Sequence, residues 1–289
     1  MMKLSQCILV SVFSMSFSIT GYSSQQDTLS WAGCGVTKKS FMSELAAAYT
    51  TKTGIKINMQ GGGATRGIRD TVTHKLDIGG SCRMNLPGYE KSELHASLHP
   101  IAWDALVAIT HKSNIVKNLT TEQIKAIYTG KITDWSEVGG ANAPIQLYVR
   151  RGKISGVGYA IRQYIFKNSQ MEFKSEHIVR SSTPLEKAVE KDPHAIGITG
   201  ISSARKRDIH LLNIDDKTPS FENIKNGSYG FYRPLYLVSS PSPSKKVRNF
   251  IHFARSNEGR RIIRDSGTVP YMDAPKLLSK MLIYGFGVQ

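Results

Sequence analysis

The sequence predicts an α/β protein of two lobes that are joined by two chain crossings. Short apolar runs alternate with helical segments from Leu29 onward, which is typical of lobes built on a mostly parallel sheet. A longer apolar run at 101–109 suits a strand that passes from one lobe to the other, and residues 233–239 suit the returning strand. Without an N-terminal leader about 265 residues remain. A chain of this length usually has more than one hydrophobic core.

The first residues have the layout of a secretory signal peptide. Lys3 precedes an uncharged apolar run at 7–17, and small and polar residues follow through Ser24. The run is too short to span a bilayer, and Cys7 lies too early for a lipoprotein anchor. We expect cleavage after about Ser23 or Ser24 and a periplasmic or secreted protein. A retained N-terminal anchor helix is the alternative.

The apolar pattern predicts the elements of each lobe in turn. For the first lobe we expect strands at 29–32, 55–59 and 76–78 and helices at 40–52, 65–75, 245–254 and 259–264. For the second lobe we expect helices at 120–128, 155–166 and 184–191 and strands at 145–149 and 195–198. Thr120 and Gln123 form a capping-box pattern. The expected domains are a signal peptide at 1–24, lobe 1 at 25–105 and 233–289, and lobe 2 at 106–232.

The chain is strongly basic, with 38 Lys and Arg against 22 Asp and Glu, a formal net charge of +16. Basic residues are spread along the chain without interleaved aromatic residues or a reading motif, so we expect no nucleic-acid binding. A positive field would speed the arrival of small anions or hold the protein near an anionic membrane. The histidines lack metal-ligand spacing, and no C-x-x-C or H-E-x-x-H motif occurs, so we expect no metal and no cofactor.

Three turns rich in glycine and hydroxyl residues each precede a predicted helix, at 33–37, 61–67 and 151–157. A helix start leaves N–H groups unpaired and carries positive partial charge, so each turn is a potential anion cradle. Hydroxyl groups add donors, and an arginine fork matches two oxygens of a tetrahedral anion. One such turn is usually a structural cap. Three of them, with Arg151 four residues before Ser155, favour a shared oxyanion site.

A stretch at 119–140, LTTEQIKAIYTGKITDWSEVGG, resembles the signature of the periplasmic phosphate-binding proteins of phosphate ABC transporters. The glycine turns, Asp-Ile-Gly at 77–79, Ala-Trp-Asp at 102–104 and Gly-Thr-Val-Pro at 267–270 follow in that family's order. The resemblance implies a type II periplasmic-binding-protein fold, with two α/β lobes that close about a hinge. It implies a monomer that captures inorganic phosphate, or a related tetrahedral oxyanion, for the membrane subunits of an ABC transporter.

The resemblance also implies which residues bind the anion. Arg151 would be the charged clamp, Thr37 would donate its hydroxyl, and Ser155 would hold the anion at a helix start with the N–H groups of Gly156 and Val157. The complete set of anion-binding residues that the resemblance implies comes from the three turns and from the segments around positions 82 and 104. It consists of Thr37, Lys38, Ala64, Thr65, Cys82, Arg83, Asp104, Arg151, Ser155, Gly156 and Val157.

The sequence departs from the family pattern at positions that determine which anion is bound. Ala64 stands where the family often has serine, which leaves Thr65 as the nearest hydroxyl, and Val157 stands where it often has threonine. At the position of Cys82 the best-known members have an aspartate, and that aspartate accepts the proton of hydrogen phosphate. Asp104 is either a substitute acceptor or a hinge hydrogen-bonder. The choice among phosphate, sulfate, arsenate and metal oxyanions such as molybdate and tungstate stays open.

Two structural roles also stay open. Arg83 either faces the anion or forms an ion pair with Asp77 or Asp104. Cys34 and Cys82 fall at the ends of strands that this fold would place side by side, and we hypothesise a disulfide beside the cleft in an oxidising compartment.

Two other classes of function compete with transport. A hydrolase would use Ser155 or Cys34 as its nucleophile, but neither lies in a G-x-S-x-G elbow and no histidine is near in the sequence. We therefore do not expect an enzyme. A secreted phosphate sensor could keep the same fold without any role in transport.

Overall fold

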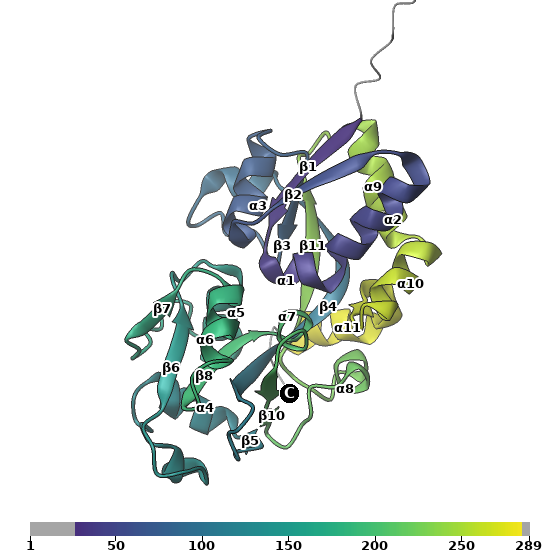
Figure 1. Cartoon of the computed structure of the whole chain (residues 1–289). Helices are drawn as coiled ribbons and strands as arrows, with labels where there is room; N and C mark the ends of the chain where they lie inside the picture. Colours follow the sequence, from purple (N-terminus) through teal and green to yellow (C-terminus); the bar gives the residue numbers. More distant parts are fainter. Residues whose placement is uncertain (1–26, 285–289) are drawn as a thin grey trace, which may run out of the picture.

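The computed structural model describes residues 27–284, and the predicted signal peptide lies outside them. The described chain forms two α/β lobes, placed one above the other in Figure 1. We call the part with β1, β2 and β3 the first lobe and the part with β6, β7 and β8 the second. Strand β4 (Ser97–His111) belongs to both, because it pairs with β11 (Tyr232–Ser239) up to Ala105 and with β8 from Leu106 onward.

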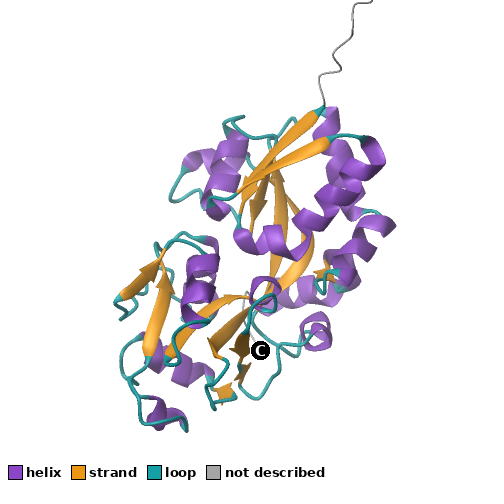
Figure 2. Cartoon of the chain, viewed as in Figure 1, coloured by secondary structure: helices purple, strands orange, loops and turns teal. Residues whose placement is uncertain are grey.

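The first lobe is a twisted sheet with the strand order β2-β1-β3-β11-β4, covered by helices on both faces (Figure 2). Its strands β1, β2 and β3 are parallel, so the loops that leave them meet at one edge of the sheet. Its elements are β1 (Thr28–Gly33), α1 (Gly35–Thr37), η1 (Lys38–Met42), α2 (Ser43–Thr53), β2 (Lys56–Gln60), α3 (Gly63–Val72), β3 (Ile78–Ser81), η2 (Lys91–His95), α9 (Lys245–Arg255), α10 (Asn257–Asp265), β12 (Val269–Pro270), η4 (Tyr271–Asp273) and α11 (Pro275–Tyr284).

The second lobe continues the same sheet through β8, β6 and β7. Strand β8 is antiparallel to β4, whereas β6 is parallel to both β8 and β7. Its elements are β5 (Asn118–Leu119), α4 (Thr121–Tyr128), η3 (Trp135–Val138), β6 (Gln146–Arg150), α5 (Gly156–Tyr164), β7 (His177–Val179), α6 (Ser182–Val189), β8 (Ala195–Gly200), α7 (Ile201–Ala204), β9 (Ile209–Leu211), β10 (Asn213–Ile214) and α8 (Phe221–Asn226).

The strongest sequence signals are confirmed. The apolar run at 101–109 is buried throughout and forms the shared strand β4. The predicted capping box starts α4: the Thr120 hydroxyl accepts from the Gln123 N–H at 3.1 Å, and the Gln123 side chain accepts from the Thr120 N–H at 2.8 Å. The three tryptophans, Trp31, Trp103 and Trp135, are buried in the core.

Several element boundaries differ from the prediction, and three of them lie at the cleft. The chain is helical without a break from Gly35 to Thr53, so this helix begins five residues before position 40. Helix α6 begins at Ser182 rather than 184, because a proline is tolerated in a first helical turn. Strand β3 runs at Ile78–Ser81, later than the expected 76–78, which brings Cys82 directly behind its end.

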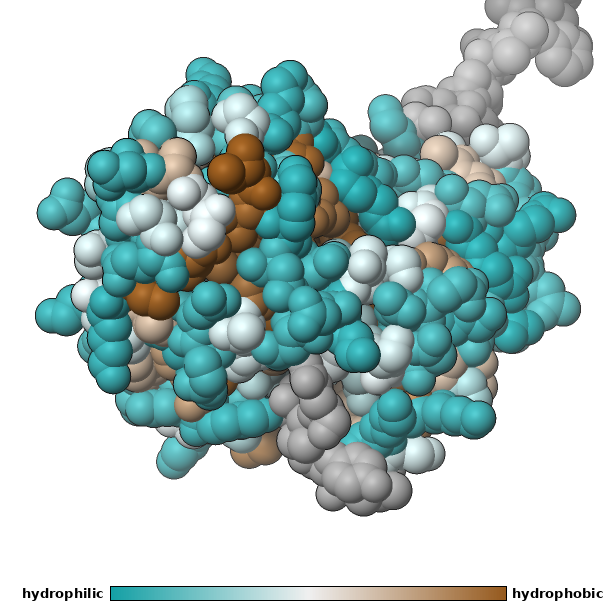
Figure 3. Space-filling model, turned by 90° about the horizontal axis from the view of Figure 1, so that it is seen from below, coloured by the Kyte–Doolittle hydropathy of each residue, from teal (hydrophilic) through white to brown (hydrophobic). Residues whose placement is uncertain are grey.

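The face seen from below in Figure 3 is mostly hydrophilic, and its most extended hydrophobic area lies in the left half of that view. Within residues 27–284, no helix is both long and apolar enough to cross a membrane.

Candidate anion-binding site

A cavity of about 430 Å³ lies between the two lobes, where the loops that leave their strands converge. The first lobe lines it with residues 33–35, 38–39, 43 and 61–65. The second lobe lines it with residues 150, 155–157 and 180–183. Parallel strands place their carboxyl ends at one sheet edge, which explains why these distant segments meet.

Two helix starts of the first lobe open into the cavity. Helix α1 follows Cys34 and α3 follows Gly62, and neither capping residue makes a side-chain hydrogen bond to its helix. Gly62 has a φ of 134°, a conformation that side chains rarely adopt, so glycine is required there. The first N–H groups of both helices are thus left for another acceptor.

Two helix starts of the second lobe face the same cavity. The Ser155 hydroxyl caps α5 by accepting from the Gly158 N–H at 3.2 Å, which leaves the amides of Gly156 and Val157 outside the helical ladder. Ser181 precedes α6 and makes no capping bond of this kind. The positive ends of these helices favour a negative charge in the cavity.

Arg150 is the buried cation of the site. Its side chain is 93% buried, with 7% exposed. One guanidinium nitrogen donates to the Ser182 hydroxyl at 2.8 Å and another to the Arg180 carbonyl at 3.1 Å, whereas Nε has no partner in the described chain. Burial, and secondly the nearby Arg233, lowers the pKa of Arg150 to about 10, so the group stays charged at neutral pH. An anion in the cavity would compensate this charge.

Arg151, the expected clamp, lies elsewhere. Its side chain is exposed and does not line the cavity, and its N–H bonds to the Val179 carbonyl at 2.8 Å. Successive residues of a strand point to opposite faces, so a shift of one position exchanges an inward arginine for an outward one. The structure therefore corrects the position of the cleft arginine from Arg151 to Arg150.

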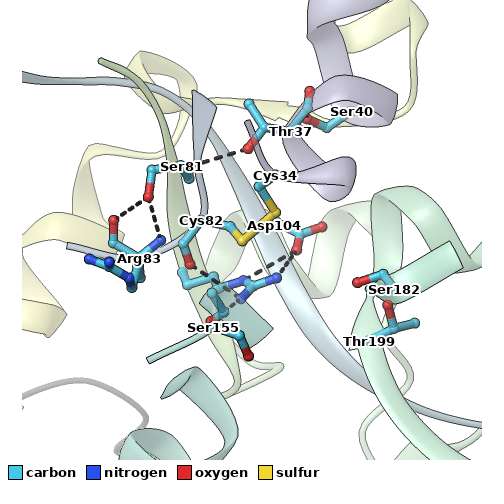
Figure 4. The surroundings of a disulfide bond; sticks show 12 residues. Cys34, Thr37, Ser40, Ser81, Cys82, Arg83, Asp104, Ser155, Ser182 and Thr199 are labelled. Atoms are coloured by element: carbon cyan, nitrogen blue, oxygen red, sulfur yellow. Dashed lines mark hydrogen bonds and ion pairs between the residues drawn. A yellow bond between two sulfur atoms is a disulfide. The ribbon is translucent and has the colours of Figure 1, made fainter. Parts of the chain in front are cut away.

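Thr37 also lies apart from the cavity lining. It is fully buried, and its hydroxyl donates to the Ser81 carbonyl at 3.3 Å (Figure 4). The early start of the helix explains this placement, because Thr37 is already inside the first turn instead of preceding it. Lys38, the next residue, does line the cavity, together with Gly35.

The remaining turn residues meet as expected. Ala64 and Thr65 line the cavity from the first lobe, and Ser155, Gly156 and Val157 line it from the second. Five of the predicted residues from two distant turns therefore share one space.

Cys34 and Cys82 form a disulfide at the cleft, as hypothesised, with their Cα atoms 6.3 Å apart (Figure 4). Cys34 lines the cavity and Cys82 is buried behind it. A side chain at Gly156 would overlap the Cys82 sulfur, so the first turn of α5 packs directly on the disulfide. The disulfide thus forms part of the contact between the lobes.

Arg83 is a structural residue and its partner is Glu93. The ion pair measures 2.8 Å, and both side chains are fully buried. Burial alone would raise the pKa of Glu93, but hydrogen bonds from Arg83, from the Leu86 N–H and from Arg69 lower it below its usual value. The Arg83 Nε donates to the Ile154 carbonyl of the second lobe at 2.9 Å. Neither Asp77 nor Asp104 is the partner, and Arg83 does not line the cavity.

Asp104 makes hydrogen bonds within the protein where the chain crosses between the lobes. Its Oδ2 accepts from Arg233 at 3.1 Å, and its Oδ1 accepts from the N–H and the hydroxyl of Ser202 at 3.1 and 2.7 Å. Arg233 also donates to the carbonyls of Cys82 and Gly156, one from each lobe, at 3.3 and 3.2 Å. Asp104 does not line the cavity, so it is not placed to accept a proton from a bound anion.

Polar contacts also join the two lobes directly. Lys39, which lines it, pairs with Glu186 at 3.1 Å and donates to the Ser203 hydroxyl at 2.9 Å. Gln170 donates to the Tyr89 hydroxyl at 2.5 Å. The described conformation is therefore one in which the lobes touch.

Sequence reasoning missed several residues of the second lobe, namely Arg150, Arg180, Ser181, Ser182 and Thr183, and also Lys39 of the first. The run of three hydroxyl residues at 181–183, before a predicted helix, is a signal of the same kind as the three glycine-rich turns. No aspartate, glutamate or histidine is among the described residues that line the cavity. Over residues 27–284, no group of three or more His, Cys, Asp or Glu side chains is placed to hold a metal ion.

The sequence and the fold match known proteins over most of their length. Residues 22–258 match the PBP superfamily domain. The phosphate-binding protein PstS of Borreliella burgdorferi is 26% identical over 273 residues, covering 90% of this chain and 97% of that protein. The crystal structure described as a phosphate ABC transporter substrate-binding protein with bound phosphate, from Clostridium perfringens, is 30% identical. It superposes with a TM-score of 0.77 and covers 84% of this chain and 99% of that one.

A phosphate transport receptor of Vibrio cholerae, 24% identical with a TM-score of 0.65, shares the fold. These structures confirm the predicted two-lobed α/β fold of type II periplasmic binding proteins. The chain therefore belongs to the PBP superfamily, in the family of phosphate ABC transporter substrate-binding proteins.

Proposed function

We propose that the protein binds inorganic phosphate, or a related tetrahedral oxyanion, in the cavity between its lobes and delivers it to an ABC transporter. The observation that carries the proposal is Arg150, a buried guanidinium with a free Nε. It lines a cavity that has no carboxylate among its described lining residues. Open helix starts from both lobes add main-chain donors around the same space. The PstS relative and the phosphate-bound relative support phosphate as the ligand.

Binding without catalysis agrees best with the chemistry of the cleft. Cys34 is held in the disulfide, and the Ser155 hydroxyl is engaged as a helix cap with a further bond to the Gly152 carbonyl at 3.3 Å. No histidine is among the described lining residues to activate either group. We therefore propose that the protein is not an enzyme.

The remaining parts of the proposal concern organisation. We propose a first lobe at 25–105 and 233–289 and a second at 106–232, because β4 changes partners between Ala105 and Leu106. We further propose an exported monomer that works with the membrane subunits of a transporter and does not bind nucleic acid.

Calorimetric titration of the phosphate-stripped protein with phosphate tests the proposal. We expect saturable binding at one site, weakening as salt screens the cationic cavity. Sulfate is expected to compete, because the described lining residues include no carboxylate that could accept the proton of hydrogen phosphate. Absence of any binding of phosphate at millimolar concentration would contradict the proposal, and tight binding of sulfate alone would reassign the ligand.

A further inference from the structure

The cleft carries more positive charge than one phosphate ion can balance. Three lining cations, Lys38, Arg150 and Arg180, make no ion pair with a carboxylate in the described part of the chain, and Lys39 is already paired with Glu186. A single phosphate group carries roughly −1.5 to −2 charge near neutral pH. A cluster of this kind matches an anion of higher charge.

The cavity is also larger than a single tetrahedral ion needs. It measures about 430 Å³ although polar contacts already join the lobes. A water molecule occupies about 30 Å³ of the liquid, and cavities of about 300 Å³ upward hold small organic ligands. In this conformation the cavity therefore has room for more than one phosphate group.

The second lobe brings two helix starts to the cavity. Strands β6 and β7 are parallel neighbours, so the loops that lead into α5 and α6 leave the same edge of the sheet, and both helix starts line the cavity. Arg150 lies between the two starts, because it ends β6 and its guanidinium donates to Ser182, the first residue of α6. Arg180, just before α6, is an exposed cation at the cavity.

We propose that the cleft has two adjoining anion subsites and takes a ligand with two linked phosphate groups, such as inorganic pyrophosphate, as well as orthophosphate. One phosphate group binds at the start of α5 against Arg150, and the second binds at the start of α6 against Arg180. The inference rests on the proposed function, since the first subsite is the proposed orthophosphate site.

Titration with pyrophosphate and with orthophosphate, both in EDTA to keep pyrophosphate free of Mg²⁺, tests this inference. We expect pyrophosphate to bind at least about tenfold more tightly, since charge-assisted hydrogen bonds to a second group add to those of the first. In Arg180→Ala this preference should fall at least about fivefold. Lys187→Ala removes a charge from an exposed position of α6 that does not line the cavity, and should preserve the preference.

The outcomes separate the two proposals. Orthophosphate that binds while pyrophosphate binds no more tightly would overturn the two-subsite inference and leave the proposed function intact. Equal losses for both ligands in Arg180→Ala would overturn it as well. If neither ligand binds, both proposals fail.

Discussion

Arg150→Ala is expected to lower the affinity for phosphate by about 100-fold or more, since each charge-assisted hydrogen bond contributes about 1.5–3 kcal/mol. The variant removes the buried guanidinium whose Nε is free and which lies between two helix starts. Arg150→Lys should recover part of the loss, because it restores the charge without the planar fork. Calorimetric titration of each stripped variant measures the effect.

Arg151→Ala is the matched control for this experiment. It removes the same charge one position along the chain, from an exposed side chain that does not line the cavity. We expect its affinity to stay within about threefold of the wild type, as for a screened surface charge. A large loss in Arg151→Ala with little change in Arg150→Ala would show that the other arginine faces the ligand. Thermal unfolding of both variants separates loss of binding from loss of fold.

Asp104→Ala should cause the largest loss of stability, about 3–5 kcal/mol in the free energy of unfolding, because it leaves the buried Arg233 without its partner. The pair lies where β4 and β11 cross between the lobes, and both side chains are fully buried. The same change removes two hydrogen bonds from Ser202. Urea unfolding of the variant and the wild type measures the loss.

Two comparisons make this test specific. Asp208→Ala removes an acidic partner from an ion pair with Lys112 whose side chains are exposed, and should change stability little. Replacing both Asp104 and Arg233 with apolar residues, Asp104→Leu with Arg233→Met, should cost less than Asp104→Ala because no unpaired charge remains buried. An Asp104→Ala protein as stable as Asp208→Ala would refute the structural role of the pair.

The fold was predictable because its signals are long and periodic. The buried run of β4 and the capping box of α4 are each written in consecutive residues, and both appear in the structure. The loop turns around Ala64 and Ser155 were also recognisable, since glycine and hydroxyl residues mark a helix start.

The details of the site depend on distances of one or two residues, which composition does not determine. Two consecutive arginines have the same chemistry, and only the end of β6 decides that Arg150 faces inward. A helix that starts five residues early buries Thr37. The partner of Arg83 is a glutamate ten positions along the chain, and that pairing follows from tertiary packing rather than a local pattern.

The most direct test of the site is a crystal structure of the protein grown with saturating phosphate. We expect the anion in the cavity between the lobes, within hydrogen-bond distance of the Arg150 guanidinium and of the main-chain N–H groups of Gly156 and Val157. Phosphate bound on another surface, with Arg150 still lacking a partner for Nε, would contradict the account.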